Sequence, residues 1–322
     1  AFSNTAISSI VILKTVTYLG GYDQQSYQLE SAFYNAKALE RVEFEDGMTI
    51  IPSRSLEFCC VKTIIIPDTV TEIEDSAFER CENLTSITIP NSVTKIGKYV
   101  FENCTGLTSI TIPNSVTKIG ESVFRDCAGL TSVTITDSVT EIGGSAFDGC
   151  TALKEINVSE ANKKYKSADG VLFNKDMTEL VIYPRGMSGD YNIPSGVTEI
   201  GGSAFDGCTG LTSVTIPDSV TLIGDDAFRG CTGLASITIP DSVTEIGWRT
   251  FACCTGLTSV TIPNSVTKIG KYVFENCTGL TSITIPNSVT KIGESVFRDC
   301  AGLTSVTITD SVTEIGGSAF DG

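Results

Sequence analysis

Apolar residues return at fixed places along nearly the whole chain, in a unit of 23 residues. In the copy from Leu107 to Gly129 the apolar positions are Leu107, Ile110, Ile112, Val116, Ile119, Val123, Phe124 and Cys127. The phenylalanine of this unit recurs at positions 78, 101, 124 and 147, and again at 205, 228, 251, 274, 297 and 320. A fixed period in the twenties indicates a stack of small units that bury their apolar faces against one another. The sequence therefore predicts a repeat solenoid rather than a globule.

Each unit predicts one strand, one turn and one further short segment. Residues 109–112 alternate polar and β-branched apolar side chains, so we expect a strand whose isoleucines face inward while Ser109 and Thr111 face outward. Pro113 ends this strand because it has no backbone N–H for the ladder. We expect residues 121–127 to form a short helical or 3₁₀ segment with the phenylalanine and cysteine facing inward. Stacked copies then align their strands in parallel, and the phenylalanines form one continuous buried row.

The repeated pattern Leu-x-x-Ile-x-Ile-Pro-x-x-Val-x-x-Ile-Gly-x-x-Ala/Val-Phe-x-x-Cys resembles the leucine-rich repeats of the BspA-like, or Treponema pallidum, type. The resemblance implies a right-handed, curved leucine-rich-repeat solenoid, α/β to mainly β, with a parallel sheet on the concave face and short helical or 3₁₀ segments on the convex side. Members of this family are mostly surface or secreted proteins of bacteria and of some parasitic protists, and several are implicated as adhesins.

We predict a single leucine-rich-repeat domain over residues 1–322. It comprises irregular repeats at 1–60, regular repeats at 61–158, an inserted β-hairpin repeat at 159–193 and regular repeats at 194–322. In the inserted part, two apolar runs surround a polar Asn-Lys-Asp turn, which is typical of a hairpin. This hairpin is either an embellished repeat or a recognition protrusion. A Gln- and Tyr-rich insertion occupies residues 21–30, and the chain starts and stops inside a repeat, so we expect the natural protein to be longer.

Residues Thr88–Gly149 are identical, letter for letter, to Thr261–Gly322, over 62 residues. Core packing explains identity at buried positions only. Identity at exposed positions implies a recent copying event or deliberate assembly of the gene. Internal sameness therefore cannot be used to nominate functional residues.

Charge and composition exclude several function classes. The formal net charge is -16 and the pI is about 4.4, which disfavours nucleic acid and anionic membrane surfaces as partners. No apolar run approaches the roughly 20 residues that cross a bilayer, so we expect no membrane insertion. The chain has no histidine, which removes the commonest general base and the usual metal ligand. Without a phosphate-binding loop or a catalytic constellation, we predict no enzyme activity and no catalytic, cofactor-binding or metal-binding residues.

Two sets of outward-facing residues are candidates for a binding surface. The strand rows supply polar positions that align in the stack, namely Ser109, Thr111, Asn114, Ser236, Thr238 and Asp241. Hydroxyl residues also simply suit an exposed β surface, which is the alternative interpretation. The second set is Trp248, Arg249 and Tyr272, which are favoured anchors in interfaces and are placed for cation–π contacts between repeats, Arg249 with Tyr272 and Trp248 with Lys271. Stabilising surface packing is the alternative for these residues.

The twelve cysteines are spaced as core residues rather than as a disulfide framework. Nine of them keep one phase of the repeat beside the phenylalanine, so we expect free, buried thiols. Cys59 or Cys60, and Cys253, break the phase and are better candidates for exposed, reactive or paired thiols.

The leading hypothesis is a non-enzymatic extracellular binding module, an adhesin-like cell-surface protein that contacts host or matrix proteins or glycans. The alternatives are a structural spacer or stalk that displays other domains, or the repeat part of a larger enzyme.

Overall fold

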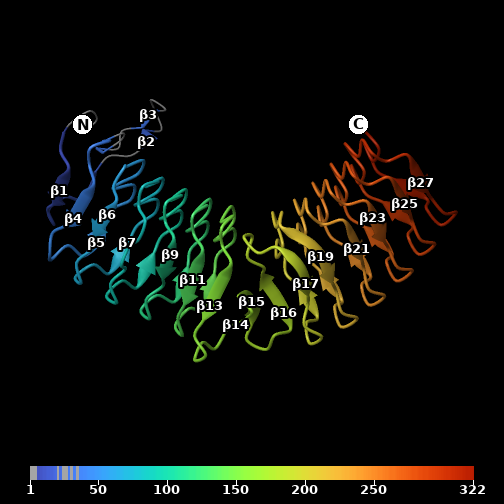
Figure 1. The fold of residues 1–322 in the computed structure, drawn as a ribbon, viewed down its shortest axis with the longest axis horizontal. Helices are drawn as coiled ribbons and strands as arrows, with labels where there is room; N and C mark the ends of the chain where they lie inside the picture. The colour runs from blue at the N-terminus through green and yellow to red at the C-terminus, as the bar shows by residue number, and fades with distance from the viewer. Residues whose placement is uncertain (1–5, 20–21, 24–27, 30–31, 34–35) are drawn as a thin grey trace. The chain divides into compact units, whose positions relative to one another are not determined.

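The computed structural model describes residues 6–19, 22–23, 28–29, 32–33 and 36–322. The chain divides into two compact units, residues 1–165 (unit 1) and 166–322 (unit 2), and each is described by itself (Figure 1). The predicted insertion at 21–30 lies largely outside the described residues. Within it, β2 (Tyr22–Asp23) and β3 (Gln28–Leu29) form an antiparallel pair.

Unit 1 is a parallel β-solenoid with two ladders of strands. The longer strands pair in register, so that Ser109 lies beside Ser132 and Ser132 lies beside Glu155. These strands are β1 (Ser9–Ile12), β4 (Arg41–Phe44), β6 (Thr63–Ile65), β9 (Ser109–Thr111), β11 (Ser132–Ile135) and β13 (Glu155–Val158). The second ladder consists of two-residue strands, β5 (Ile50–Ile51), β7 (Glu72–Ile73), β8 (Lys95–Ile96), β10 (Lys118–Ile119) and β12 (Glu141–Ile142).

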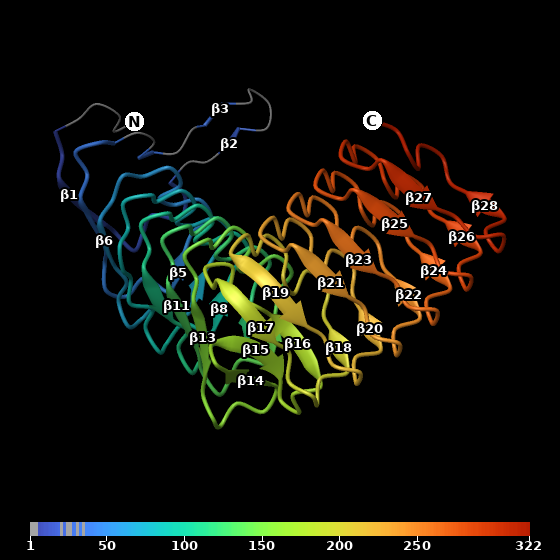
Figure 2. The same ribbon diagram turned by 45° about the vertical axis from the view of Figure 1, so that its right-hand side comes forward.

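Unit 2 repeats this arrangement after a hairpin (Figure 2). β15 (Val171–Asn174) and β16 (Glu179–Ile182) pair antiparallel where the two apolar runs predict a hairpin, next to β14 (Tyr165–Ala168). The longer strands that follow are β17 (Gly189–Asn192), β19 (Leu211–Thr215), β21 (Ser236–Thr238), β23 (Ser259–Thr261), β25 (Ser282–Thr284) and β27 (Ser305–Thr307). The short strands are β18 (Glu199–Ile200), β20 (Leu222–Ile223), β22 (Glu245–Ile246), β24 (Lys268–Ile269), β26 (Lys291–Ile292) and β28 (Glu314–Ile315). The division of the chain into irregular, regular and inserted repeats stays a prediction.

The expectation of helical or 3₁₀ segments is wrong for the described part of the chain, which contains no helix. In residues 121–127 the backbone at Ser122 and Asp126 has φ of 54° and 58°, in the left-handed region. A right-handed helix cannot pass through such residues. The spacing of three between the apolar positions fitted both a helical turn and this sequence of tight turns, so the pattern alone did not distinguish them.

The left-handed residues turn alternate N–H groups of this segment toward the next repeat. The amides of Ser122, Phe124 and Asp126 donate to the carbonyls of the residues 22 positions later, at 3.1, 2.9 and 2.7 Å. The amides of Arg125 and Cys127 donate within the segment, three residues back. Hydrogen bonds between repeats thus replace the ladder of a helix. The same positions have positive φ in the repeats from Arg54 to Ser318, except in the hairpin repeat, where neither Val181 nor Arg185 has positive φ.

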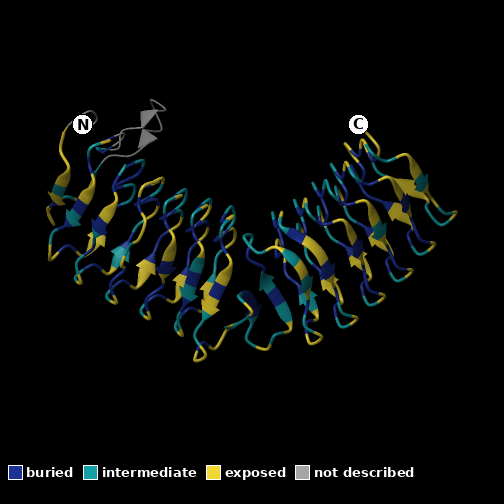
Figure 3. Ribbon diagram, in the orientation of Figure 1, coloured by how far each residue is buried: buried dark blue, intermediate teal, exposed yellow. Residues whose placement is uncertain are grey.

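Buried and exposed positions alternate along the coils of each unit (Figure 3). The phenylalanines form a buried row in each unit, as predicted, except for Phe320 in the last repeat, which is exposed. Phe101 and Phe124 stack at 5.6 Å between ring centroids, and Phe274 and Phe297 also stack at 5.6 Å. At the hairpin repeat Tyr183 takes the place of phenylalanine, with its ring 4.9 Å from that of Phe205. Close stacking also demands small residues where backbones meet. A Cβ on Gly129 would lie 2.3 Å from the carbonyl oxygen of Thr105.

Candidate functional site

The predicted polar rows are exposed along the longer strands of each unit, a surface here called the strand face. Ser109 and Thr111 point outward from β9, and Asn114 is exposed just after the strand. In the part of the chain that the structure describes, the side-chain hydroxyls of Ser109 and Thr111 have no hydrogen-bond partner. A shallow depression of about 320 Å³ lies here, and its lining includes Ser86, Thr88, Asn91, Ser109, Thr111 and Pro113.

Other hydroxyl residues of the same repeats brace the stack instead. Ser138 Oγ donates to the carbonyl of Val116 at 2.8 Å, and Thr131 Oγ1 donates to the carbonyl of Thr108 at 3.0 Å. Equivalent bonds recur in unit 2, for example from Ser265 to Val243. The hydroxyls therefore fall into a bracing set and a free set. Sequence periodicity identified all of them as rows but could not separate the two sets.

In unit 2 the predicted residues Ser236, Thr238 and Asp241 are also exposed, on and just after β21. They lie beside a strand-face depression of about 500 Å³ rather than in it, since β21 pairs with β23, which lines it. Its lining includes Ser259, Thr261, Asn264, Ser282, Thr284 and Asn287. These residues occupy the same repeat positions as the lining in unit 1.

The aromatic candidates lie on the turn segments, away from the strand rows. Trp248 is 42% exposed, and the Arg249 guanidinium carbon lies 4.9 Å from the centroid of its ring. Arg249 also lies 3.7 Å from Glu275, and the Tyr272 hydroxyl donates to Glu294 at 3.1 Å. The cation–π contact thus joins chain neighbours, whereas the predicted cross-repeat partners are taken by carboxylates; Lys271, for instance, pairs with Glu294 at 2.8 Å.

A further depression, here called the charged groove, follows the short strands of each unit, and sequence reasoning did not nominate it. In unit 1 its volume is about 870 Å³ and its lining includes Lys95, Lys98, Lys118, Glu121 and Glu141. In unit 2 its volume is about 430 Å³ and its lining includes Lys268, Lys271, Lys291, Glu294 and Glu314.

The charges of this groove are paired across repeats. Lys98 lies 2.8 Å from Glu121, and this hydrogen bond raises the pKa of the lysine and lowers that of the glutamate. Lys118 lies 2.5 Å from Glu141. Such exposed pairs contribute little to stability, but they fix which charges remain available to a partner.

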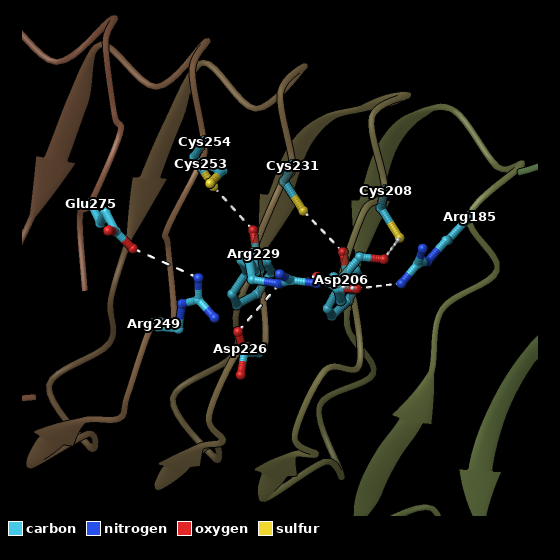
Figure 4. A network of polar contacts seen from close by, with 12 residues as sticks. Arg185, Asp206, Cys208, Asp226, Arg229, Cys231, Arg249, Cys253, Cys254 and Glu275 are labelled. Carbon is cyan, nitrogen blue, oxygen red and sulfur yellow. Dashed lines mark hydrogen bonds and ion pairs between the residues drawn. The ribbon is translucent and has the colours of Figure 1, made fainter. Parts of the chain in front are cut away.

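Figure 4 shows an ionic network that joins the hairpin repeat to the repeats after it. Asp206 is 5% exposed and pairs with Arg185 and with Arg229, whose Nε lies 2.7 Å from Oδ1 of the aspartate. Arg229 Nε also lies 3.3 Å from Asp226. Burial raises the pKa of Asp226, and this arginine opposes only part of the rise. The network holds adjacent repeats together. It was not predicted, although the change of sign between Asp206 and Arg229 at one repeat position was visible in the sequence.

The cysteines are free, and the row beside the phenylalanines is buried, as expected. The thiol of Cys127 donates to the carbonyl of Phe101 at 2.9 Å, and the same bond recurs from Cys300 to Phe274. Burial raises the pKa of the Cys104 thiol to about 12. Of the pair Cys59 and Cys60, either of which was expected to break the phase, Cys59 is buried with the row and Cys60 is half-buried; Cys253 is half-buried as well.

The described residues contain no group of three or more Cys, Asp or Glu side chains that could hold a metal ion. Across those same residues, no helix has the length and apolar character needed to cross a membrane.

Comparison with known proteins supports the resemblance seen in the repeat. The family model described as BspA type leucine rich repeat region (6 copies) matches residues 1–84, 28–154, 71–182 and 190–322. A leucine-rich cell surface protein of Faecalibacterium prausnitzii is 38% identical over 95% of this chain and 80% of its own, with a TM-score of 0.77. No curated protein matches the chain.

Two further solved structures have a similar fold at lower identity. A leucine-rich repeat protein of Eubacterium ventriosum is 28% identical over 88% of this chain and 83% of its own, with a TM-score of 0.76. The pneumococcal vaccine antigen PcpA is 26% identical over 94% of this chain and 72% of its own, also with a TM-score of 0.76.

Proposed function

The chain belongs to the BspA-type leucine-rich repeat family, and from this premise we propose that it is a non-enzymatic binding module displayed outside the cell. Its ligands would be host or matrix proteins, with glycans as the second ligand class, and its role would be adhesin-like. The cell-surface description of the Faecalibacterium prausnitzii relative supports this localisation.

The observation that carries the proposal is the set of free hydroxyls on the strand face. Side chains such as Ser109, Thr111 and Thr284 are ordered by strand pairing, exposed, and not used by hydrogen bonds that brace the stack. Because strand pairing already holds the backbone of these residues in register, their side chains lose little conformational entropy when a partner forms hydrogen bonds with them. They surround apolar floors such as Ile110 and Ile283, which is the mixture that a protein interface uses.

The test is binding of the purified chain to immobilised extracellular matrix proteins and to a glycan array at physiological salt. Because the strand-face depression occurs in both copies, the decisive variant is the double substitution Thr111→Arg with Thr284→Arg. We expect it to abolish captured ligand without changing the circular dichroism spectrum. Ala128→Arg with Ala301→Arg, at exposed turn positions of the same repeats, is the matched control and should bind normally.

Either of two results would count against this function. If no matrix protein or glycan is retained, the chain is better explained as a spacer or stalk that displays other domains. If a ligand binds equally well to both double variants, binding occurs elsewhere than on the strand face.

A further inference from the structure

Leu222 and Trp248 break the charged rows of unit 2. The position of Leu222 in the repeat is filled by Glu199 before it and by Glu245 after it, yet Leu222 is 48% exposed. The position of Trp248 is filled by Asp225 before it and by Lys271 after it. The other large hydrophobic residues that are exposed in unit 2 lie in its last repeat, at Ile308, Ile315 and Phe320.

These two side chains lie in adjacent repeats on one surface. The Trp248 amide donates to Oδ1 of Asp225 at 2.6 Å, and the Asp226 amide donates to the Trp248 carbonyl at 2.9 Å. In the following repeats the same two positions line the charged groove, through Lys268 and Lys271. By register, Leu222 and Trp248 therefore form the apolar continuation of that groove.

The Trp248 ring is already ordered before any partner arrives. Arg249 covers it at 4.9 Å, and Arg249 is itself held near Glu275. An exposed indole fixed in this way loses little freedom on binding, which is what makes tryptophan an effective interface anchor.

The carboxylates around the patch lack cationic partners. Glu179 lies beside Glu199, and Glu199 lies beside Leu222, in neighbouring parallel strands with their side chains on the same side. Within unit 2, no lysine or arginine lies within salt-bridge distance of Glu179, Glu199 or Asp225. By contrast, Glu141 of unit 1 and Glu314 of unit 2, which occupy the same repeat position as Glu199, each pair with a lysine.

We propose that Leu222 and Trp248, with Glu179, Glu199 and Asp225 at their rim, form a docking site for a basic segment of a partner protein that also carries an apolar side chain. The apolar side chain would pack against Leu222 and the indole, and lysine or arginine side chains would reach the carboxylates, which have no cationic partner within unit 2. The net charge of -16 favours the approach of such a segment over long range. This site is on a different surface from the strand face, so the two proposals can be tested independently, and failure of one does not affect the other.

Trp248 is the only tryptophan of the chain, so its fluorescence reports on this site alone. The probe is an acetylated octapeptide, Lys-Leu-Lys-Ala-Lys-Leu-Lys-Ala, and the comparison peptide has glutamate in place of each lysine. We expect the lysine peptide to shift and change Trp248 emission saturably and the glutamate peptide to leave it unchanged. Raising NaCl to about 0.5 M should weaken the interaction, because rim carboxylates are screened.

The variants are Leu222→Ala and Glu199→Gln, each at an exposed or half-exposed position where folding is not at stake. We expect Leu222→Ala to weaken binding at least about fivefold and Glu199→Gln to weaken it less, with a smaller salt dependence. Lys118→Ala, at the row position of Leu222 in unit 1, is the matched control and should bind as the parent chain does. Trp248→Ala, followed by anisotropy of a fluorescein-labelled peptide, should lose binding.

An unchanged Trp248 spectrum at peptide concentrations up to about 1 mM would overturn the proposal, because a dissociation constant above that concentration is too weak for specific recognition. So would an equal response to the glutamate peptide, or equal affinity of the Leu222→Ala variant and the parent chain.

Discussion

Two stretches of this molecule have the same 62 residues and different surroundings. In unit 1 the segment Thr88–Gly149 is followed by a repeat whose strand β13 pairs with β11. There Ile135 is fully buried and Phe147 is 5% exposed, whereas their twins Ile308 and Phe320 are 38% and 43% exposed. The difference teaches that a repeat does not bury its own core. Its neighbour does, and the same phenylalanine is a core residue or a surface residue according to what stacks on it.

The ionic surroundings of the two copies also differ. In unit 1, the position directly after the phenylalanine row is glutamate in three consecutive repeats, at Glu57, Glu79 and Glu102. The pKa of Glu102 is raised, mainly by burial and secondly by the negative charge of Glu79. Beside the second copy, Glu275, the twin of Glu102, lies 3.7 Å from Arg249. Both glutamates pair with an arginine of the following repeat at 3.5 Å, Glu102 with Arg125 and Glu275 with Arg298. On the side of the preceding repeat, Glu102 interacts with a like charge and Glu275 with an opposite one, because that repeat differs.

The largest expected effect comes from the twin phenylalanines. Phe147→Ala should lower the free energy of unfolding by about 3–5 kcal/mol, because it leaves a cavity in a covered core. Phe320→Ala should cost less, about 1–2 kcal/mol, because the ring is 43% exposed and stacks on Phe297 on one side only. Urea unfolding of the two variants measures both. Phe124→Ala and Phe297→Ala, buried in both copies, serve as reference and should lose the same amount as Phe147→Ala. Equal losses for Phe147→Ala and Phe320→Ala would show that burial does not depend on the neighbour.

The second effect concerns the ionic network between the hairpin repeat and the next two. Asp206→Asn leaves Arg185 without its buried carboxylate and should cost about 2–4 kcal/mol, the lower part of the range reflecting the partial exposure of Arg229. Asp321→Asn changes the same row position at an exposed site and should cost under about 0.5 kcal/mol. The measurement is the free energy of unfolding of both variants in urea, at low and at high salt. A loss for Asp206→Asn no greater than that of the control would show that the network does not hold the repeats together.

The third effect is a pH dependence that arises from Glu57, in the acidic row of unit 1. Glu57 is 4% exposed, its Oε2 has no hydrogen-bond partner, and burial, followed by Glu79, raises its pKa to about 6 from the ordinary 4.5. Between those values the folded state binds more protons than the unfolded state, so stability should fall as pH rises from 4.5 through 6. The total is about 2 kcal/mol.

Glu57→Gln should remove that slope and leave the variant more stable than the parent above pH 6. Urea midpoints at half-unit steps from pH 4 to 7 provide the measurement. Parallel pH profiles for the two proteins would rule out Glu57 as the titrating group.

The smallest effect distinguishes the twin thiols. In the folded chain, iodoacetamide should label Cys60 and Cys253, which are half-buried, before the ten buried cysteines.

Among the buried cysteines, Cys300 is 5% exposed and its pKa is raised to about 11, whereas its twin Cys127 is fully buried and its pKa is raised further. Cys300 should therefore react faster than Cys127. Mass spectrometry separates the two, because their tryptic peptides end differently. Rapid labelling of all twelve without denaturant would contradict a buried row.

Much of the fold could be predicted because each apolar position repeats many times. Ile110, Phe124 and Cys127 are buried where the period requires, and Ser109 and Thr111 are exposed. The turn segment could not be predicted, since positive φ at residues such as Tyr99, Asp126 and Arg249 has no compositional signature like that of glycine. Those residues accept the strained conformation because it turns their amides toward a neighbouring repeat.

The candidate sites were predictable only in part, for a related reason. The rows that contain Ser109 and Thr111 were visible, but whether a hydroxyl is free or donates to a carbonyl depends on contacts between repeats that a single unit does not encode. The Arg249–Trp248 stack likewise required knowing that Glu275 holds the arginine from the next repeat. Glu199 and Leu222 attracted no notice in the sequence, because each is ordinary until its register partner is known.

The left-handed residues of the turn segments carry a consequence for chain length. Where another repeat follows, the amide of such a residue donates to a carbonyl of that repeat, as at Ser122 and Asp126, and this bond offsets the backbone strain. An array has one fewer junction than it has members, so cooperativity should grow steeply when members are added to a short array and level off in a long one. A peptide of one excised member, with no junction at all, should be a random coil.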